Sequence, residues 1–326
     1  MRSIPLNLLT LYADLQQGVD FPQAGADQEP ATVSRRLVGG KRRIYLTTRD
    51  GRQRYVGTVG DRVAEATAAG AQRMALIARD RRKTITALKA AGVPAPDAMT
   101  GRVIEALAGA GLFDRGTVLI GTTAYQIYPM LVGAVLSTGT LTTLDADLAM
   151  TRVAIGQMTR LPAMADILKG VDPTFEARLH RDHKYPFTFM SGSSFVVDVL
   201  TTAGRSDGAV LIKGLACGAQ PLKYLDYLIE DPVSTVALVG SGVRVKVPQP
   251  ARYALHKLVV AQKRTPGSPK IPKDILQARE LIEALTDRDP RVVEDAIDDV
   301  LARGPAWRKL IREGLKMAGV EPHRTP

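Results

Sequence analysis

The sequence is poor in the residues and segments that mark several classes of protein. It holds one cysteine in 326 residues, which excludes an internal disulfide framework and any zinc site built from several cysteines. It has no run near the ~18 consecutive apolar residues that a membrane-spanning helix needs. The apolar stretch over residues 4–15 is interrupted by Pro5, Asn7 and Asp14 and has no basic lead-in, so we do not expect a secretory signal. We therefore expect a soluble, cytoplasmic protein without membrane contact.

The basic charge is concentrated in one segment. The chain carries 44 Lys and Arg against 33 Asp and Glu, a net charge of +11. Residues 35–83 hold fourteen basic and four acidic side chains, so this segment alone accounts for +10. Such a segment suits contact with the phosphates of a nucleic acid, and its Tyr45 and Tyr55 could stack on bases. A well-solvated, arginine-rich surface is the alternative interpretation.

The N-terminal third is predicted to hold a hairpin and two helices. Residues 16–34 have few large apolar side chains and contain Gly, Pro and Asp, which indicates a loop. Two β-type runs then flank Arg49-Asp50-Gly51, and Asp-Gly between such runs is a hairpin signal. Apolar residues recur every three or four positions over 61–91 and again over 97–110, so both stretches are predicted helices.

The rest of the chain alternates strand and helix patterns. Strands are predicted at 117–120, 144–150, 186–190, 195–200, 233–239 and 243–247. Helices are predicted at 122–135, 158–168, 251–264, 273–286, 290–302 and 305–318. This succession predicts an α/β (α+β) fold in which a mixed sheet is flanked by helices.

Three aspartates on two predicted strands are the main chemical signal. Asp145 and Asp147 lie two residues apart on one strand, so their side chains share a face. Asp198 is a single acid within an apolar run, and an adjacent strand would bring it beside the pair. Carboxylates gathered in a partly buried site repel one another unless cations lie between them. Their oxygens suit Mg²⁺ or Mn²⁺, and two such ions support in-line nucleotidyl transfer; solvated strand acids are the alternative.

A second signal precedes the aspartates, where a predicted strand ends at Gly121 and a helix opens with Thr122 and Thr123. Backbone N–H groups, hydroxyls and the positive end of a helix then meet at one point, which suits the phosphates of a nucleotide. Simple helix capping by these residues is the alternative interpretation.

In this order the motifs resemble the nucleotidyltransferase superfamily of DNA polymerase β, CCA-adding enzymes, aminoglycoside nucleotidyltransferases and abortive-infection toxin-type enzymes. More closely, the chain is similar to stand-alone bacterial nucleotidyltransferase-fold proteins, near the abortive-infection and minimal nucleotidyltransferase-like groups. The resemblance covers roughly residues 36–300. It is carried by Gly121-Thr122-Thr123-Ala124, Asp145-Ala146-Asp147, Val197-Asp198-Val199, Gln220-Pro221-Leu222, the stretch from Pro250 to Leu258, and Lys273-Asp274.

The resemblance implies a catalytic core over residues 112–215. A basic hairpin and helical region precedes it over 1–111, and a hairpin and helical region follows over 216–326. The implied activity is transfer of a nucleoside monophosphate from an NTP such as ATP to an acceptor hydroxyl. Charge favours an RNA end, such as that of tRNA, over a protein side chain or a small molecule. A non-catalytic module that binds nucleotide or nucleic acid is the main alternative, and a phosphodiester hydrolase is a third.

The resemblance also implies roles for individual residues. Asp145 and Asp147 would bind both metal ions, and Asp198 would complete the second metal site and help activate the acceptor hydroxyl. Gly121, Thr122 and Thr123 would hold phosphate. Lys257 and Arg264, seven residues apart on one helix, would point into the cleft and offset the charge of the triphosphate, with Lys273 as a further cation.

Two histidines stand at metal-ligand spacing in His180-Arg181-Asp182-His183. The segment is charged and no further ligand accompanies it. We therefore interpret it as a polar surface loop.

Overall fold

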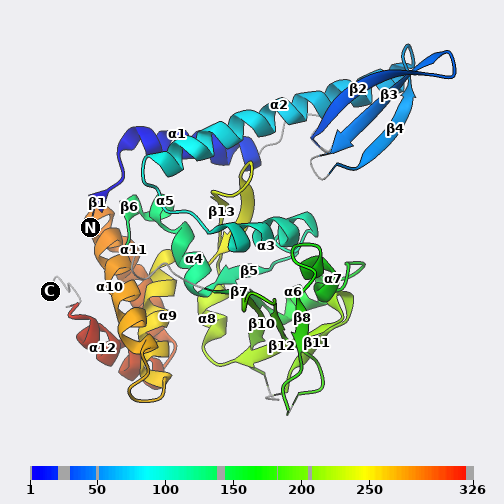
Figure 1. The fold of residues 1–326 in the computed structure, drawn as a ribbon. Helices are drawn as coiled ribbons and strands as arrows, with labels where there is room; N and C mark the ends of the chain where they lie inside the picture. Colours follow the sequence, from blue (N-terminus) through cyan, green and yellow to red (C-terminus); the bar gives the residue numbers. More distant parts are fainter. Residues whose placement is uncertain are drawn as a thin grey trace.

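The computed structural model describes residues 2–20, 30–48, 51–137, 144–181, 183–204 and 208–320. Figure 1 shows a body built on a mixed sheet, C-terminal helices packed together at one side, and a projecting arm that ends in a small sheet. Some predicted features lie outside the described residues: Arg49 and Asp50 of the hairpin turn, part of the expected loop (21–29), and Asp182 of the histidine segment.

The arm is a three-stranded antiparallel sheet carried by one long helix. It comprises β2 (Ala31–Val38), β3 (Lys41–Thr48), β4 (Gln53–Thr58) and α2 (Arg62–Ala90). Small side chains on α2 allow the helix to lie close to the sheet, and the buried core between them contains Ala31, Ile44, Leu46, Ala64, Ala68 and Ala71. The carboxylate of Asp61 caps α2 by accepting from the N–H groups of Val63 and Ala64.

The root of the arm is held to the body by α1 (Leu6–Asp20), which packs beside α2 and β13 (Val233–Ala237). The Tyr12 hydroxyl lies 2.7 Å from the Thr235 hydroxyl and accepts from the Val236 N–H at 3.1 Å. The hairpin and the helix at 61–91 are confirmed, but the loop predicted over 16–34 is wrong at both ends. Residues 16–20 continue α1 because Tyr12 and Leu15 anchor it to the body, and 31–34 begin β2, which pairs along β3.

The body contains a seven-stranded mixed sheet. Its members are β5 (Val118–Ile120), β7 (Asp145–Met150), β8 (Glu176–Arg178), β9 (Thr188–Met190), β10 (Val196–Thr202), β11 (Val210–Ile212) and β12 (Cys217–Leu222). The strand order is β11-β12-β10-β7-β5, with β9 and β8 continuing from β10 off this path. β10 is parallel to β7 and β12, whereas β5, β9 and β11 join antiparallel to their neighbours. The expected α/β fold with a mixed sheet is therefore confirmed.

Helices surround this sheet. They are α3 (Ala98–Gly109), α4 (Gly121–Ile127), α5 (Pro129–Val132), α6 (Arg152–Gln157), α7 (Met164–Lys169) and α8 (Leu225–Ile229), with a 3-10 turn at Lys213–Leu215. Two helix predictions need correction. The helix expected over 122–135 is split before Pro129 and ends at Val132, because the backbone turns left-handed at Gly133 and then forms β6 (Ala134–Val135) against β1 (Arg2–Ser3). The helix expected over 158–168 begins only at Met164, after Pro162.

The C-terminal part follows the sequence patterns closely. β13 pairs with β14 (Val243–Val247), followed by α9 (Pro250–Lys263), α10 (Lys270–Arg288), α11 (Pro290–Ala302) and α12 (Pro305–Ala318). α10 begins three residues earlier than predicted. Within the described segments, no helix has both the length and the apolar character needed to cross a membrane. The division of the chain after residues 111 and 215 stays a prediction.

Candidate active site

The three aspartates share one face of two central strands. Asp198 of β10 stands directly across from Asp147 of β7 in the parallel register, and Val196 stands across from Asp145. The intervening residues Ala146 and Val197 are fully buried on the opposite face. Strand alternation thus directs the apolar residues into the core and leaves the carboxylates on the other side of the sheet. The sheet brings together the residues that the sequence only placed on separate strands.

Gly121 closes the site from the neighbouring strand. Ile120, the last residue of β5, pairs with Asp147, and the chain then turns at Gly121 with a positive φ of 63°. A side chain at this position would collide with the Asp147 carboxylate. The Tyr253 hydroxyl of α9 donates to the Gly121 carbonyl at 2.8 Å, which ties the C-terminal helices to this turn. Glycine is required here for both its backbone conformation and its lack of a Cβ.

The two threonines after Gly121 differ in their surroundings. The Thr123 hydroxyl is buried and donates to the Asp145 carbonyl at 3.1 Å, so it connects the start of α4 to β7. Thr122 is also largely buried, with 8% of its surface exposed. The Thr123 hydroxyl, one of the two predicted to bind phosphate, is therefore already engaged in a hydrogen bond between α4 and β7.

Burial and mutual repulsion set the electrostatics of the carboxylates. Burial raises the pKa of Asp147 to about 7, and the neighbouring charges of Asp145 and Asp198 add to this effect. Burial also raises the pKa of Asp198, while a hydrogen bond from Thr188 acts in the opposite direction. Lys270 lies near enough to both carboxylates to lower each pKa. A site that raises the pKa of its acids in this way favours a bound cation.

A cluster of cations from the C-terminal helices lies beside these acids. Arg264 was predicted on the helix of Lys257, but α9 ends at Lys263 and the backbone of Arg264 is extended. Lys257 and Arg264 both pair with Asp274, at 2.9 Å and 2.5 Å, and only 2% of the Asp274 side chain is exposed. One buried carboxylate therefore holds together the two basic residues that the sequence pattern placed in one cleft. Lys270 and Lys273 extend the cluster, and burial lowers the pKa of Lys273, with Lys257 adding to the shift. Sequence patterns alone do not place Lys270 or Asp274 in this cluster, because only the packing of α10 against α9 brings them there.

The histidine segment contributes to the site in a way that the sequence interpretation missed. The Thr188 hydroxyl of β9 donates to Asp198 at 2.5 Å, and His180 Nε2 lies 3.0 Å from the same hydroxyl. The imidazole of His180 stacks on Phe187, with ring centroids 4.4 Å apart and planes 2° from parallel. Thr188 stands opposite Asp198 in the antiparallel register, so the predicted strand pair contained a signal for it. His180 reaches this chain of contacts only through the fold of its loop.

The carboxylates of the candidate site are possible ligands of a metal ion. Within the part of the chain that the structure describes, no group of three or more His, Cys, Asp or Glu side chains is arranged as a metal site. Asp147 and Asp198 nevertheless lie in register on one face, and Asp147 is protonated more readily than a solvated aspartate. Ionised carboxylate oxygens are hard ligands that suit Mg²⁺ or Mn²⁺, and such a cation would relieve the repulsion that raises these pKa values. The residues fit such an ion chemically.

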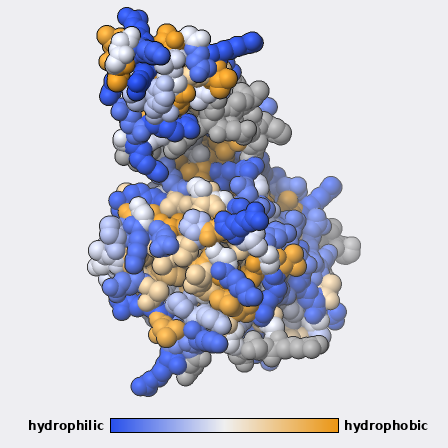
Figure 2. Space-filling model, turned by 90° about the vertical axis from the view of Figure 1, so that its right-hand side faces the viewer, coloured by the Kyte–Doolittle hydropathy of each residue, from blue (hydrophilic) through white to orange (hydrophobic). Residues whose placement is uncertain are grey.

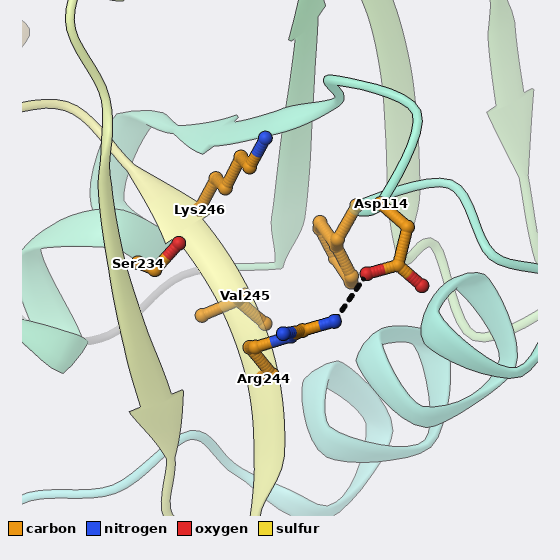
Figure 3. A pocket seen from close by; sticks show the side chains of 6 residues that line it. Asp114, Ser234, Arg244, Val245 and Lys246 are labelled. Carbon is orange, nitrogen blue, oxygen red and sulfur yellow. Dashed lines mark hydrogen bonds and ion pairs between the residues drawn. The ribbon is translucent and has the colours of Figure 1, made fainter. Parts of the chain in front are cut away.

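Two surface pockets lie away from these carboxylates. The first has a volume of about 230 Å³ and is lined by Phe113, Asp114, Ser234, Arg244, Val245 and Lys246. In Figure 3, Arg244 extends from its strand toward Asp114, and the two groups form an ion pair at 2.7 Å. The second pocket, of about 690 Å³, lies between α9 and α12. Neither is lined by Asp145, Asp147 or Asp198.

One family model matches most of the chain. The profile of a nucleotidyltransferase family matches residues 98–302, well over half of the chain. This range contains Gly121, the three aspartates and the cation cluster, and it leaves out the arm. A search of curated protein sequences finds no match. Among solved structures, the chain is similar to an antigenic nucleotidyltransferase-like protein from Paracoccidioides brasiliensis, at 15% identity and a TM-score of 0.33, over 65% of this chain and 92% of that one.

Proposed function

Because the chain belongs to the nucleotidyltransferase family, we propose that it transfers a nucleoside monophosphate from an NTP to an acceptor hydroxyl, using two Mg²⁺ or Mn²⁺ ions. In this reaction the acceptor oxygen bonds to the α-phosphorus, the bond from that phosphorus to the α–β bridging oxygen breaks, and pyrophosphate leaves. The acceptor hydroxyl gives up its proton. The observation that carries the proposal is the alignment of Asp147 and Asp198 beside the Gly121 turn.

The three carboxylates are the proposed ligands of the metal ions. Asp145 and Asp147 would hold both ions, and Asp198 would complete the second site. When bound, the ions stabilise charge on the attacking and leaving oxygens. Asp198 also accepts the proton of the acceptor hydroxyl. Thr188 holds the Asp198 carboxylate in one orientation through its 2.5 Å hydrogen bond, which supports this assignment.

The triphosphate is assigned to the Gly121 turn and the cation cluster. Thr122 is the better candidate for a phosphate contact, since Thr123 already donates to the Asp145 carbonyl. The cluster gathers four cations beside the proposed metal ligands, and Asp274 pairs with two of them; this positive charge supports neutralisation of a triphosphate. Its cations are Lys257, Arg264, Lys270 and Lys273. An RNA end is the acceptor that the basic arm favours.

Labelled-nucleotide transfer tests the proposal. Each α-³²P-labelled NTP is incubated with the protein, Mg²⁺ and either total RNA or lysate protein, and label in macromolecules is measured. We expect transfer by the native chain and loss of at least 100-fold in Asp147→Asn and Asp198→Asn, the scale of removing an electrostatic catalytic group. Asp80→Asn, at an exposed α2 carboxylate, is the control and keeps full activity.

The outcomes separate the candidate functions. Transfer that survives Asp147→Asn would overturn the proposed site. Tight Mg-NTP binding with no transfer to any acceptor would favour a non-catalytic binding module. In a parallel reaction with labelled RNA and no NTP, release of labelled nucleotide would indicate a phosphodiester hydrolase.

A further inference from the structure

The outer face of the arm sheet has a composition unlike that of its inner face. The inner face packs Ile44 and Leu46 against the small residues of α2. By strand alternation, the residues between them point away from α2. We call this surface the outer sheet face, and it comprises Thr32, Ser34, Arg36, Arg43, Tyr45, Thr47, Gln53 and Tyr55. Apart from the Ser34 hydroxyl, which is buried, it offers aromatic rings, arginines and neutral hydrogen-bonding groups.

The two tyrosines of this face are neighbours flanked by arginines. Tyr45 and Tyr55 are cross-strand partners with ring centroids 5.6 Å apart, and 49% of Tyr55 is exposed. The Arg36 guanidinium lies 5.8 Å from the Tyr45 ring, and that of Arg43 lies 5.7 Å from the Tyr55 ring. These separations are near the outer limit of a cation–π contact. Each guanidinium lies over its tyrosine ring at this distance, so the face presents two ring–cation pairs side by side.

Within the described segments, the arginines of the face have no acidic partner. Arg36 stands directly opposite Arg43 in the antiparallel register, and like charges so placed destabilise a strand pair. Arg36 donates to the neutral Gln53 at 3.4 Å, and no acidic side chain among the described residues pairs with Arg36 or Arg43. By contrast, the neighbouring Arg35 lies on the inner side and pairs with Glu65 of α2 at 2.8 Å. An anion on the outer sheet face would relieve the repulsion.

We propose that the outer sheet face binds single-stranded nucleic acid, with bases stacking on Tyr45 and Tyr55 and phosphates contacting Arg36 and Arg43. Aromatic rings beside a basic track are the arrangement that recognises unpaired bases without sequence preference. In a duplex the base faces are already stacked on one another, so the tyrosines would have nothing to bind. The arrangement therefore selects single strands over duplexes and over polyanions that have no rings.

The position of this face suits a long acceptor. The sheet lies at the far end of α2 (Figure 1), a helix of 29 residues, which at 1.5 Å per residue is about 43 Å long. In Figure 2 the arm stands clear of the body and exposes both hydrophilic and hydrophobic side chains. A strand held there contacts the protein at a second point, remote from the carboxylates. The inference that this strand is the acceptor rests on the proposed function, whereas the binding itself does not.

Fluorescence anisotropy with the full chain tests the binding. The probe is a labelled oligo(U) of about 12 nucleotides, within the range that one such site covers, compared with a duplex of equal length. We expect the single strand to bind more tightly. Tyr45→Ala with Tyr55→Ala should weaken binding of oligo(U) about 10- to 100-fold, whereas Tyr45→Phe with Tyr55→Phe should retain it, because phenylalanine keeps the stacking surface.

A matched pair of double variants tests the arginines. Arg36→Gln with Arg43→Gln should reduce the slope of log K against log salt by about 1.4, because each phosphate contact on a single strand contributes about 0.7. Arg62→Gln with Arg73→Gln removes the same charge from exposed positions on the side of α2 opposite Ala64 and Ala71. This control should change the slope much less. Thermal melting of each variant confirms that the arm remains folded.

Several outcomes would overturn the proposal. They are unchanged affinity in the tyrosine-to-alanine variant, equal effects of the two arginine pairs, equal affinity for duplex, and competition by a polyglutamate peptide as effective as that of oligo(U). Asp147→Asn should bind oligo(U) normally. Binding without nucleotidyl transfer would therefore count against the proposed function alone. Transfer to a short acceptor with no oligo(U) binding would count against this inference alone.

Discussion

Gly121 leaves no space for a side chain beside the carboxylate of Asp147, because the last residue of β5 and Asp147 are paired in the sheet. The contact joins the proposed phosphate-binding turn to the proposed metal ligand. A displacement of either residue would therefore disturb the position of the other. This close approach explains why the turn between β5 and α4 needs a glycine with positive φ.

Gly121→Ala is expected to reduce both stability and transfer activity. The left-handed conformation alone costs on the order of 1–3 kcal/mol for a residue with a side chain, and the clash with Asp147 adds to it. Urea unfolding and label transfer measure the two effects. Gly156→Ala in α6 is the control, because nothing lies within 4 Å of its added Cβ. That variant should be neutral or slightly stabilised, and equal losses in both would contradict the assignment.

The metal-free protein should lose stability as the pH rises toward neutrality, and Asp147 should account for part of the loss. Its pKa is 3.8 when unperturbed and about 7 in the fold, so between these values the folded state binds the proton that the unfolded state has released. Stability then falls as the pH rises across this window. We expect Asp147→Asn to be roughly 2 kcal/mol more stable than the native chain at pH 8 in EDTA, with little difference near pH 4. A gain that is the same at both pH values would contradict this origin.

Magnesium is expected to raise the thermal midpoint of the native chain at pH 8. An ion that binds only the folded state stabilises it by about 2.7 kcal/mol at a concentration of 100 times its Kd. Asp147→Asn and Asp198→Asn should respond much less, since each removes a proposed ligand, while Asp80→Asn should respond fully. Differential scanning fluorimetry with increasing MgCl₂ makes the comparison, and an identical response in all four proteins would argue against the assigned ligands.

Asp274→Asn is expected to destabilise the protein by about 3 kcal/mol, because removing one member of a buried charge network leaves its partners uncompensated. Both Lys257 and Arg264 depend on this carboxylate. Asp226→Asn, at an exposed carboxylate 3.6 Å from Arg303, should cost under about 0.5 kcal/mol. Urea unfolding of both variants is the measurement. A small effect of Asp274→Asn would mean that solvent screens the cluster.

Thr188→Val should lower kcat with little change in the KM for NTP, because it removes the hydroxyl between His180 and Asp198. The two side chains have nearly equal volume, so the sheet should be retained. Thr188→Ser keeps the hydroxyl and should restore most of the activity. Steady-state kinetics with both variants provides the comparison, and a serine variant as inactive as the valine variant would indicate a packing role instead.

Local sequence patterns correctly predicted the helices and strands in which buried residues recur at one regular spacing along the chain. The helix at 61–91 has apolar residues on one face and a capping Asp61, and both features are present in α2. The failures occurred where tertiary contacts overrode the local signal. β2 carries Ser34-Arg35-Arg36, which has no apolar alternation, and it is a strand because β3 offers eight paired positions. Pro129 and Pro162 break stretches that were otherwise apolar enough for continuous helices.

The sequence by itself determined that Asp145 and Asp147 share a face, because side chains alternate along any strand. It also determined that the positive charge lies in one segment, since that is a matter of composition. Only the tertiary structure decided that Asp198 faces Asp147, that Asp274 joins Lys257 to Arg264, and that Tyr45 meets Tyr55 between two arginines. The reason is that strand register and helix packing result from burying the whole core, and no local period encodes which distant residues then become neighbours.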